Sequence, residues 1–199
     1  MACGDDNYIF GSGTMITTRF LTPLEYPQYA TWLKKLDDET RATYFGVKYT
    51  DEQIDNLVNG IVQNVTKHHF LVAEYKGNWI GTIHIADTLP GEVEFGFVVD
   101  KEHRGHGIAD RMMDEALIWC RNRGYNAVYM HCLSWNTPIK RLCLKYGMEL
   151  ETEYGETETK LPLPPADLTT LTEEVINRNR QAYRMILQTV NPFLKELYS

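Results

Sequence analysis

A strand, a glycine-rich turn and a helix follow one another in the stretch VEFGFVVDKEHRGHGIADRMMDEAL, which begins at Val93. Its first seven residues are mostly apolar, and from Ile108 onward apolar residues recur at helical spacing. The first amides of a helix lack backbone partners and carry partial positive charge, and glycine lets a ligand approach them closely. Gly105 and Gly107, with the cation of Arg104 beside them, therefore predict a site for a phosphate or diphosphate.

The rest of the chain is acidic, which sets this cationic turn apart. The chain has 199 residues, 43% of them hydrophobic, and a net charge of -7. This length suits one globular domain, with or without an appendage. The charge argues against a nucleic-acid partner and against an anionic membrane surface, whereas it tolerates cationic substrates such as amines.

The cysteines indicate a reducing environment. Cys3, Cys120, Cys132 and Cys143 show neither paired spacing nor a CxxC pattern. The start MACGDDNYIF lacks a basic, apolar signal segment, and no apolar run approaches the ~18 residues of a membrane span. We therefore expect reduced thiols and a cytoplasmic location. We expect no metal, since the pair His68-His69 has no partner at ligand spacing.

The hydrophobic pattern predicts alternating strands and helices. A first strand is expected over 14–21. A helix then starts either at Thr22, where Pro23 and Glu25 complete a capping pattern, or at Pro27, and runs to residue 35. A second helix follows a capping box formed by Thr50 and Gln53. The later elements are strands at 70–75, 79–87 and 92–100, a helix at 107–123, a strand at 126–133, a short helix at 136–147 and a strand at 148–154.

Short connections between consecutive strands favour antiparallel hairpins. The predicted fold is therefore a mixed α/β layer with a central, mostly antiparallel twisted sheet and helices on both faces. We expect three regions: a flexible lead-in at 1–14, the main domain at 15–156, and a proline-rich joint with a helical C-terminal extension at 157–199.

Three kinds of phosphate binder use this turn chemistry, and two fit poorly. A P-loop needs Gly-Lys-Ser/Thr before its helix, and a dinucleotide fingerprint needs a third glycine where Asp110 stands. The third is coenzyme A. The segment RGHGIA resembles the Arg/Gln-x-x-Gly-x-Gly/Ala motif of the GNAT acyltransferase superfamily, carried by Arg104, Gly107 and Ala109.

A second motif supports this resemblance. The segment NTPIKRLCLKYGME resembles Asn-x-x-Ala-x-x-Leu-Tyr-x-x-x-Gly-Phe, with matches at Asn136, Leu142 and Gly147. Ile139 replaces the alanine and Met148 the phenylalanine. The resemblance covers about residues 15–155 and implies the GNAT fold, acetyl-CoA as cofactor and a small-molecule or peptide amine as acceptor.

The resemblance also implies residue roles at the cofactor. The strand before the turn would part from its neighbour, and the Val99 amide would stabilise the developing oxyanion. Asn136 would contact the pantetheine arm. The backbone of Phe97, Val98 and Val99 would line the thioester and pantetheine, and the pyrophosphate would lie on the amides of Arg104, Gly105, His106, Gly107, Ile108 and Ala109.

An amine attacks only when it is neutral, so the site needs a base. His131 lies where the ribosomal-protein N-terminal acetyltransferases have a glutamate base, and Glu94 lies on the strand before the turn, where other members keep one. His84 is a weaker candidate. A strand histidine without a catalytic role and an exposed strand carboxylate are the structural alternatives for His131 and Glu94.

The general acid departs from the family pattern. The family has a tyrosine seven residues after the asparagine, where this chain has Cys143. A thiol can donate a proton, although it is smaller than a phenol and a weaker hydrogen-bond donor. Tyr146, one helical turn away, is a substitute. Alternatively, the thiolate leaves unassisted or takes a proton from water, and Cys143 is a small buried apolar residue.

The sequence indicates the acceptor site less specifically than the cofactor site. Tyr8, Tyr44, Phe45 and Tyr49 cluster near the N-terminal helices, where this family shapes its acceptor pocket, although aromatic residues also pack in cores. The expected function is N-acetyl transfer from acetyl-CoA to a primary amine by direct attack. The alternative is an acyl-CoA-binding module of little or no activity, acting as a sensor or interaction protein. The C-terminal helix is a candidate homodimer contact.

Overall fold

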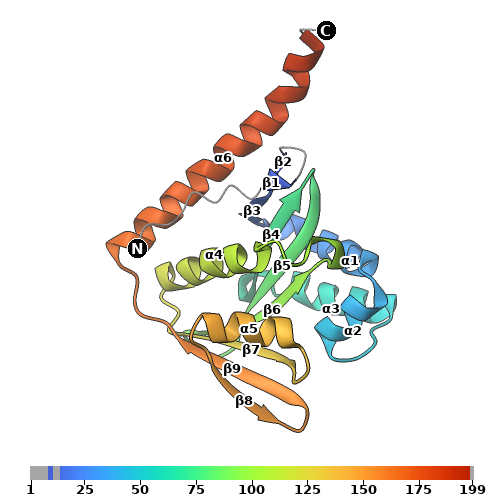
Figure 1. The fold of residues 1–199 in the computed structure, drawn as a ribbon, viewed down its shortest axis with the longest axis vertical. Coiled ribbons are helices and arrows are strands. Elements are labelled where there is room, and N and C mark those ends of the chain that lie inside the picture. The colour runs from blue at the N-terminus through green and yellow to red at the C-terminus, as the bar shows by residue number, and fades with distance from the viewer. Residues whose placement is uncertain (1–8, 11–13, 198–199) are drawn as a thin grey trace.

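The structure is a computed structural model that describes residues 9–10 and 14–197 (Figure 1). Its centre is a seven-stranded sheet in which β6 and β7 run parallel and all other neighbouring strands are antiparallel. The strands, in their order across the sheet, are β3 (Thr17–Phe20), β4 (His68–Tyr75), β5 (Asn78–Asp87), β6 (Glu92–Val99), β7 (Ala127–Leu133), β9 (Glu156–Pro162) and β8 (Glu149–Glu153). A separate two-stranded ladder joins β1 (Ile9–Phe10) to β2 (Thr14–Met15).

Helices cover both faces of this sheet, as the sequence predicts. The first face packs against α4 (Ile108–Asn122) and α5 (Thr137–Lys145), and the second against α1 (Tyr26–Lys35) and α3 (Asp51–Gln63). Successive side chains of β4 are buried on opposite faces of the sheet. Leu71 and Ala73 are buried under α4, while Phe70 and Val72 are buried under α1 and α3. The predicted mixed α/β architecture is confirmed.

The helix starts follow local capping chemistry. Thr50 and Gln53 form the predicted capping box, with the Thr50 amide donating to Gln53 Oε1 at 2.8 Å and the Gln53 amide to Thr50 Oγ1 at 3.2 Å. Glu25 accepts from the Thr22 amide at 2.8 Å and closes a single 3₁₀ turn over Pro23–Glu25. Helix α1 then begins at Tyr26, between the two predicted starts.

Helix α2 (Asp38–Phe45) was not predicted. It is short and, among its residues, only Thr40 is fully buried, so it carries no apolar stripe. Asp37 caps it, accepting from the Thr40 amide at 3.0 Å. Asp37, Asp38 and Glu39 thus form the acidic start of this helix.

The sheet continues past the expected boundary at residue 156, because residues 156–162 form β9 and lie between β7 and β8. The inward side chains of β9 are Thr157 and Thr159, exposed by 0% and 1%, whereas Glu156, Glu158 and Lys160 face outward. This strand alternates threonine with charge instead of apolar with polar residues, so its pattern resembles a loop. The extension therefore begins after Pro162.

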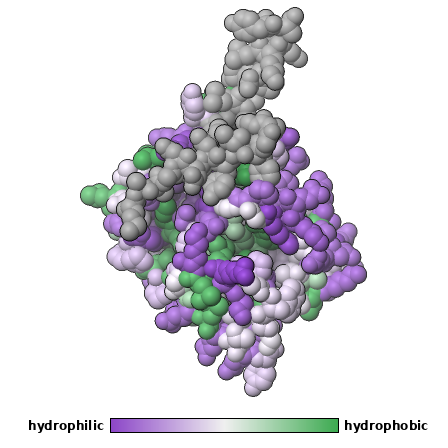
Figure 2. All heavy atoms as spheres, viewed as in Figure 1, coloured by the Kyte–Doolittle hydropathy of each residue, from purple (hydrophilic) through white to green (hydrophobic). Residues whose placement is uncertain are grey.

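The extension is the helix α6 (Leu168–Leu197), which projects from the body of the domain (Figure 1). Its first turns are held against α4, where Asn122 donates to the Thr170 carbonyl at 3.0 Å and Arg123 pairs with Glu174 at 3.2 Å. Hydrophilic side chains predominate on the face shown in Figure 2. None of the helices in the described part of the chain has the length and apolar character needed to cross a membrane.

Candidate active site

The site begins where β6 and β7 part. The two strands pair at only three positions, from Glu92 opposite Ala127 to Glu94 opposite Tyr129, and then separate. The Asp100 amide donates to the Ile80 carbonyl on the β5 side at 2.9 Å. Since amides along a strand point to alternate edges, the amides of Val99 and Phe97 point into the opening, and that of Val98 points to β5.

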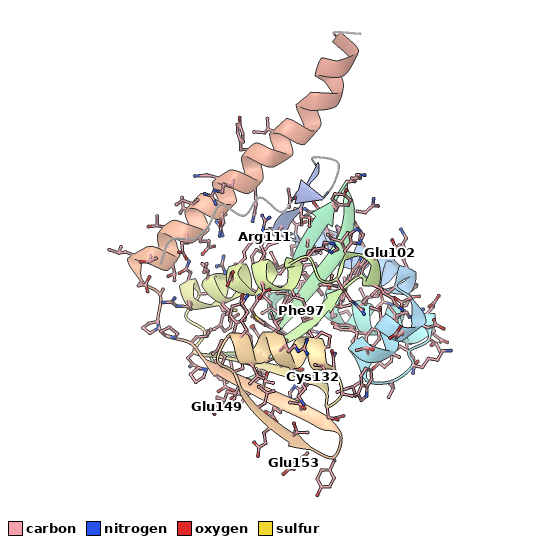
Figure 3. The ribbon with its side chains drawn as sticks, viewed as in Figure 1. Phe97, Glu102, Arg111, Cys132, Glu149 and Glu153 are labelled. Carbon is pink, nitrogen blue, oxygen red and sulfur yellow. The ribbon has the colours of Figure 1, made fainter. Side chains whose placement is uncertain are left out.

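A cavity of about 770 Å³ occupies this opening. Figure 3 labels one residue from each bordering strand, Phe97 of β6 and Cys132 of β7. The cavity reaches both faces of the sheet. On the α4 face it is lined by the glycine turn and the start of α5, and on the α2 face by Thr40, Thr43, Tyr44, Phe45, Gly46, Tyr49, Leu57, His84 and Ala86.

The glycine turn has the predicted geometry. Gly105 and Gly107 have φ of +78° and +70°, which favour glycine, and Ile108 begins α4 directly afterwards. Among the described residues, the amides of Gly105, Gly107, Ile108 and Ala109 donate to no backbone acceptor. All four residues line the cavity, whereas His106 does not and has its Nδ1 3.3 Å from the His103 carbonyl. The turn thus offers several amides to an anion.

The charges around the turn are partly engaged. Arg104 lines the cavity, but its Nε donates to the Val99 carbonyl at 3.0 Å and its Nη2 to Thr40 Oγ1 at 2.6 Å. Asp110, whose charge would repel a diphosphate, forms an ion pair with Lys145 of α5 at 2.5 Å. Asn136, directly before α5, also lines the cavity.

The two predicted bases meet at the opening. His131 Nδ1 lies 3.1 Å from Glu94 Oε1, and its Nε2 lies 3.8 Å from Glu158 on β9. Their side chains are 49% and 42% exposed, and both residues line the cavity. The sequence indicates them as two alternative candidates for the base. In the structure they are in contact and could share a proton.

The two candidate proton donors, Cys143 and Tyr146, lie outside the cavity lining. Cys143 is fully buried with its Sγ 3.9 Å from Met130 Sδ, and burial raises its pKa to about 11. The Tyr146 hydroxyl lies 2.7 Å from a carboxylate oxygen of Asp114 on α4, and burial together with this contact raises its pKa far above the usual range. Neither residue lines the cavity.

The α2 face holds polar groups that few sequence signals indicate. The hydroxyls of Tyr44 and Tyr29 lie 2.7 Å apart, and burial raises the pKa of Tyr44 to about 12. A Cβ built on Gly96 of β6 would lie 2.7 Å from the Tyr44 hydroxyl. A glycine inside a strand is the one sequence signal for such a close approach. Tyr8, grouped with Tyr44 in the sequence analysis, lies outside the described residues.

His68, His69 and His84 belong to the packing around the sheet. His84 lines the cavity, stacks on Phe70 at 4.6 Å and has its Nε2 3.0 Å from His68 Nδ1. Burial, with a smaller effect of His68, lowers the pKa of His84 to about 3, so it is uncharged at neutral pH. His69 packs against Trp119, with ring centroids 4.7 Å apart.

Solved structures of acetyltransferases share this fold. The GNAT domain of S. lividans PAT superposes with a TM-score of 0.64 at 18% identity, over 78% of this chain and 94% of that one. Spermidine N-acetyltransferase from Vibrio cholerae, solved with CoA and spermine, gives 0.59 at 17% over 74% and 95%. Ribosomal-protein-alanine N-acetyltransferase from Brucella melitensis gives 0.57 at 18% over 73% and 99%.

One of the two sequence comparisons finds a match. No curated protein matches the chain. The model of the acetyltransferase (GNAT) family matches residues 23–148, which is more than half of the chain and includes both sequence motifs. This match agrees with the parted strands, the glycine turn and the order of elements. The chain therefore belongs to the acetyltransferase (GNAT) family.

Proposed function

We propose that the protein is an acetyl-CoA-dependent N-acetyltransferase that acts on a primary amine. The observation that carries this proposal is the single cavity that passes between β6 and β7. It joins the amides of the glycine turn on one face to the Glu94–His131 pair at the opening. A diphosphate and an amine could therefore reach one reaction centre from opposite faces of the sheet.

The residues present fit the cofactor. The amides of Gly105, Gly107, Ile108 and Ala109 would hold the diphosphate. The Asp110 charge is already countered by Lys145. The parted edge of β6 would take the pantetheine arm, with Phe97 and Val99 offering amides and Asn136 a side chain. When bound, acetyl-CoA supplies an acetyl group activated as a thioester. The CoA and acetyl-CoA complexes solved for structural relatives support this assignment.

The chain's own groups would then act on the amine and the carbonyl. The amide of Val99 is aimed into the opening and would stabilise negative charge on the carbonyl oxygen. Glu94 and His131 would accept the proton that the amine nitrogen loses as the nitrogen–carbon bond forms and the carbon–sulfur bond breaks. Because Cys143 and Tyr146 lie off the cavity, neither would donate a proton to the leaving group, and water would be the donor.

The test is CoA release in the presence of acetyl-CoA and a panel of amines. Glu94→Gln and His131→Gln keep the size of each side chain and remove its basicity, so each should lower kcat by ~10²-fold or more at neutral pH. Glu153→Gln on the exposed edge strand β8 is the matched control. Wild-type rates in both site variants would remove the base assignment.

A catalytically weak acyl-CoA-binding module is the second candidate. The observation in its favour is that neither residue expected to donate a proton lines the cavity. Isothermal titration calorimetry separates the two. Tight acetyl-CoA binding without transfer to any amine in the panel would establish the module and exclude the enzyme.

We also propose a cytoplasmic location and a homodimer formed through α6. The described cysteines Cys120, Cys132 and Cys143 are free thiols, which suits a reducing compartment. The described part of α6 exposes Leu168, Leu171, Val175, Ile176, Tyr183 and Ile186. Light scattering should give twice the chain mass for the full chain and the chain mass after deletion of residues 168–199. A monomeric full chain would exclude the dimer.

A further inference from the structure

We propose that the acceptor is a small monoamine with an apolar body, either aromatic or aliphatic, and not a polyamine. Its nitrogen would lie at the Glu94–His131 pair and its body against α2 and α3. This inference rests on the proposed function, because it concerns the amine side of the same cavity.

The strands direct one set of side chains to the α2 face. Side chains alternate along β6 and β7, and Val98 is buried with α1 and α3, so Glu94 and Gly96 also face that way. Met130 is buried under α4, so His131 and Leu133 face α2. A Cβ built on Gly46, at the end of α2, would lie 3.9 Å from a Leu133 methyl. The amine side is thus a compartment between β6, β7 and α2.

The helical wall of this compartment is aromatic and aliphatic. The rings of Phe45 and Tyr49 stack at 4.2 Å with an angle of 3° between their planes, and Tyr44 meets Phe45 edge-on at 4.9 Å. Leu57 of α3 completes the lining and is 38% exposed. Burying apolar carbon against such a wall stabilises the complex in proportion to the apolar area removed from water. The wall therefore favours an acceptor amine with an apolar body.

The charges on this side are confined to the strands. Among the described residues that line the α2 side, the carboxylates are Glu94, which is in contact with His131, and Glu156, which lies opposite Leu133 at the start of β9 and away from the helices. His84 is uncharged at neutral pH. Phe45 and Tyr49 cover one face of each other, which reduces their capacity to bind a cation over a ring. A second ammonium group lying along the wall would lose its hydration without gaining a carboxylate.

The experiment compares five amines: ethylamine, hexylamine, 2-phenylethylamine, putrescine and spermidine. Binding to the CoA-loaded protein is measured by calorimetry, and transfer from acetyl-CoA by CoA release. Hexylamine and 2-phenylethylamine should exceed ethylamine and spermidine in kcat/KM by at least ~10-fold. Spermidine or putrescine matching the apolar monoamines, or no amine binding at all, would overturn the inference.

Three variants locate the preference on the wall. Phe45→Ala should lower the ratio of 2-phenylethylamine to ethylamine kcat/KM by ~10-fold, because apolar contact is lost. Leu57→Asp places a carboxylate at a partly exposed position that tolerates charge, so it should raise the kcat/KM for putrescine relative to that for hexylamine. This variant still tests the inference if Phe45→Ala fails to fold. Val47→Ala is the control, since Val47 is 60% exposed and lies off the cavity.

The two readouts separate this inference from the proposed function. Monoamines that bind the CoA-loaded protein in the predicted order without any CoA release would support the acceptor class and overturn acetyl transfer. Polyamines that are acetylated best would support acetyl transfer and overturn the acceptor class. An unchanged amine preference in both Phe45→Ala and Leu57→Asp would also overturn the inference.

Discussion

Arg104 donates a hydrogen bond from its guanidinium to the hydroxyl of Thr40 across 2.6 Å. Thr40 is 1% exposed and belongs to α2, so this bond ties the glycine turn to the helix that carries the aromatic wall. A second contact between α2 and the segment before the glycine turn is the ion pair of Lys101 and Glu39, at 2.7 Å. The cofactor side and the acceptor side of the cavity are therefore linked through one buried hydroxyl.

Removing that hydroxyl should weaken both sides together. Thr40→Val keeps the shape and leaves the Arg104 guanidinium without this partner, a loss of ~1–3 kcal/mol. We expect KM to rise about fivefold or more for acetyl-CoA and for the amine, with kcat little changed. Steady-state kinetics on both substrates measure this, with Thr172→Val on α6 as control. A loss of thermal stability with both KM values unchanged would contradict the link.

Gly96 and Gly60 make a matched pair. A Cβ at Gly96 would lie 2.7 Å from the Tyr44 hydroxyl, so Gly96→Ala must displace that ring from the cavity wall. We expect amine kcat/KM to fall by ~10-fold or more, by analogy with other sub-ångström misplacements at active sites. Gly60 in α3 has nothing within 4 Å of its added Cβ. Gly60→Ala should stabilise the fold by ~0.5–1 kcal/mol in urea titrations and leave activity intact. Full activity in Gly96→Ala would show that Tyr44 is not needed where it stands.

Buried His84 predicts a loss of stability in mild acid. Its pKa is lowered to about 3 in the folded protein, so below the ordinary value of about 6.5 the unfolded chain binds a proton that the folded chain does not. The free energy of unfolding should fall by ~2 kcal/mol between pH 7 and pH 5 from this residue. Burial also lowers the pKa values of His68 and His69. Urea unfolding of the wild type and His84→Gln at the two pH values gives the difference, and an equal pH dependence in both proteins would count against it.

Cys143 should matter for packing and not for proton transfer. Cys143→Ala removes one buried sulfur and should cost ~1 kcal/mol of stability while kcat stays within about twofold. Cys143→Tyr, which restores the usual family residue, should be more disruptive because the site is fully buried. Scanning calorimetry and CoA release measure the two effects. A Cys143→Ala protein that folds normally and has lost turnover would return this thiol to the mechanism.

The sequence predicted what rests on local chemistry. The strand, glycine turn and helix around Gly105 and Gly107, and the capping box at Thr50, depend on neighbouring residues and are confirmed in the structure. Helix α2 and strand β9 are among the elements that the sequence did not predict. Helix α2 has no apolar stripe, and β9 buries threonines, so hydrophobic periodicity could find neither.

The candidate site was predicted residue by residue but not as an arrangement. The contact between Glu94 and His131 arises from the relative register of β6 and β7 beyond their last paired position, which no local pattern encodes. The burial of Cys143 depends likewise on Met130, thirteen positions away along the chain, across the α5–sheet interface. Pairwise distances of this kind follow from tertiary packing, which overrides what a motif position suggests.

The position of β9 between β7 and β8 has a consequence for genes that encode shortened versions of this chain. A stop codon after Glu153 would spare both sequence motifs, yet it would strip β7 of the partner that covers its outer edge from Ala127 to Leu133. That edge carries His131, and exposed strand edges invite pairing with foreign chains. A truncated product would thus read as an intact acetyltransferase by its motifs while lacking the support of its own reaction centre, and it would tend to aggregate.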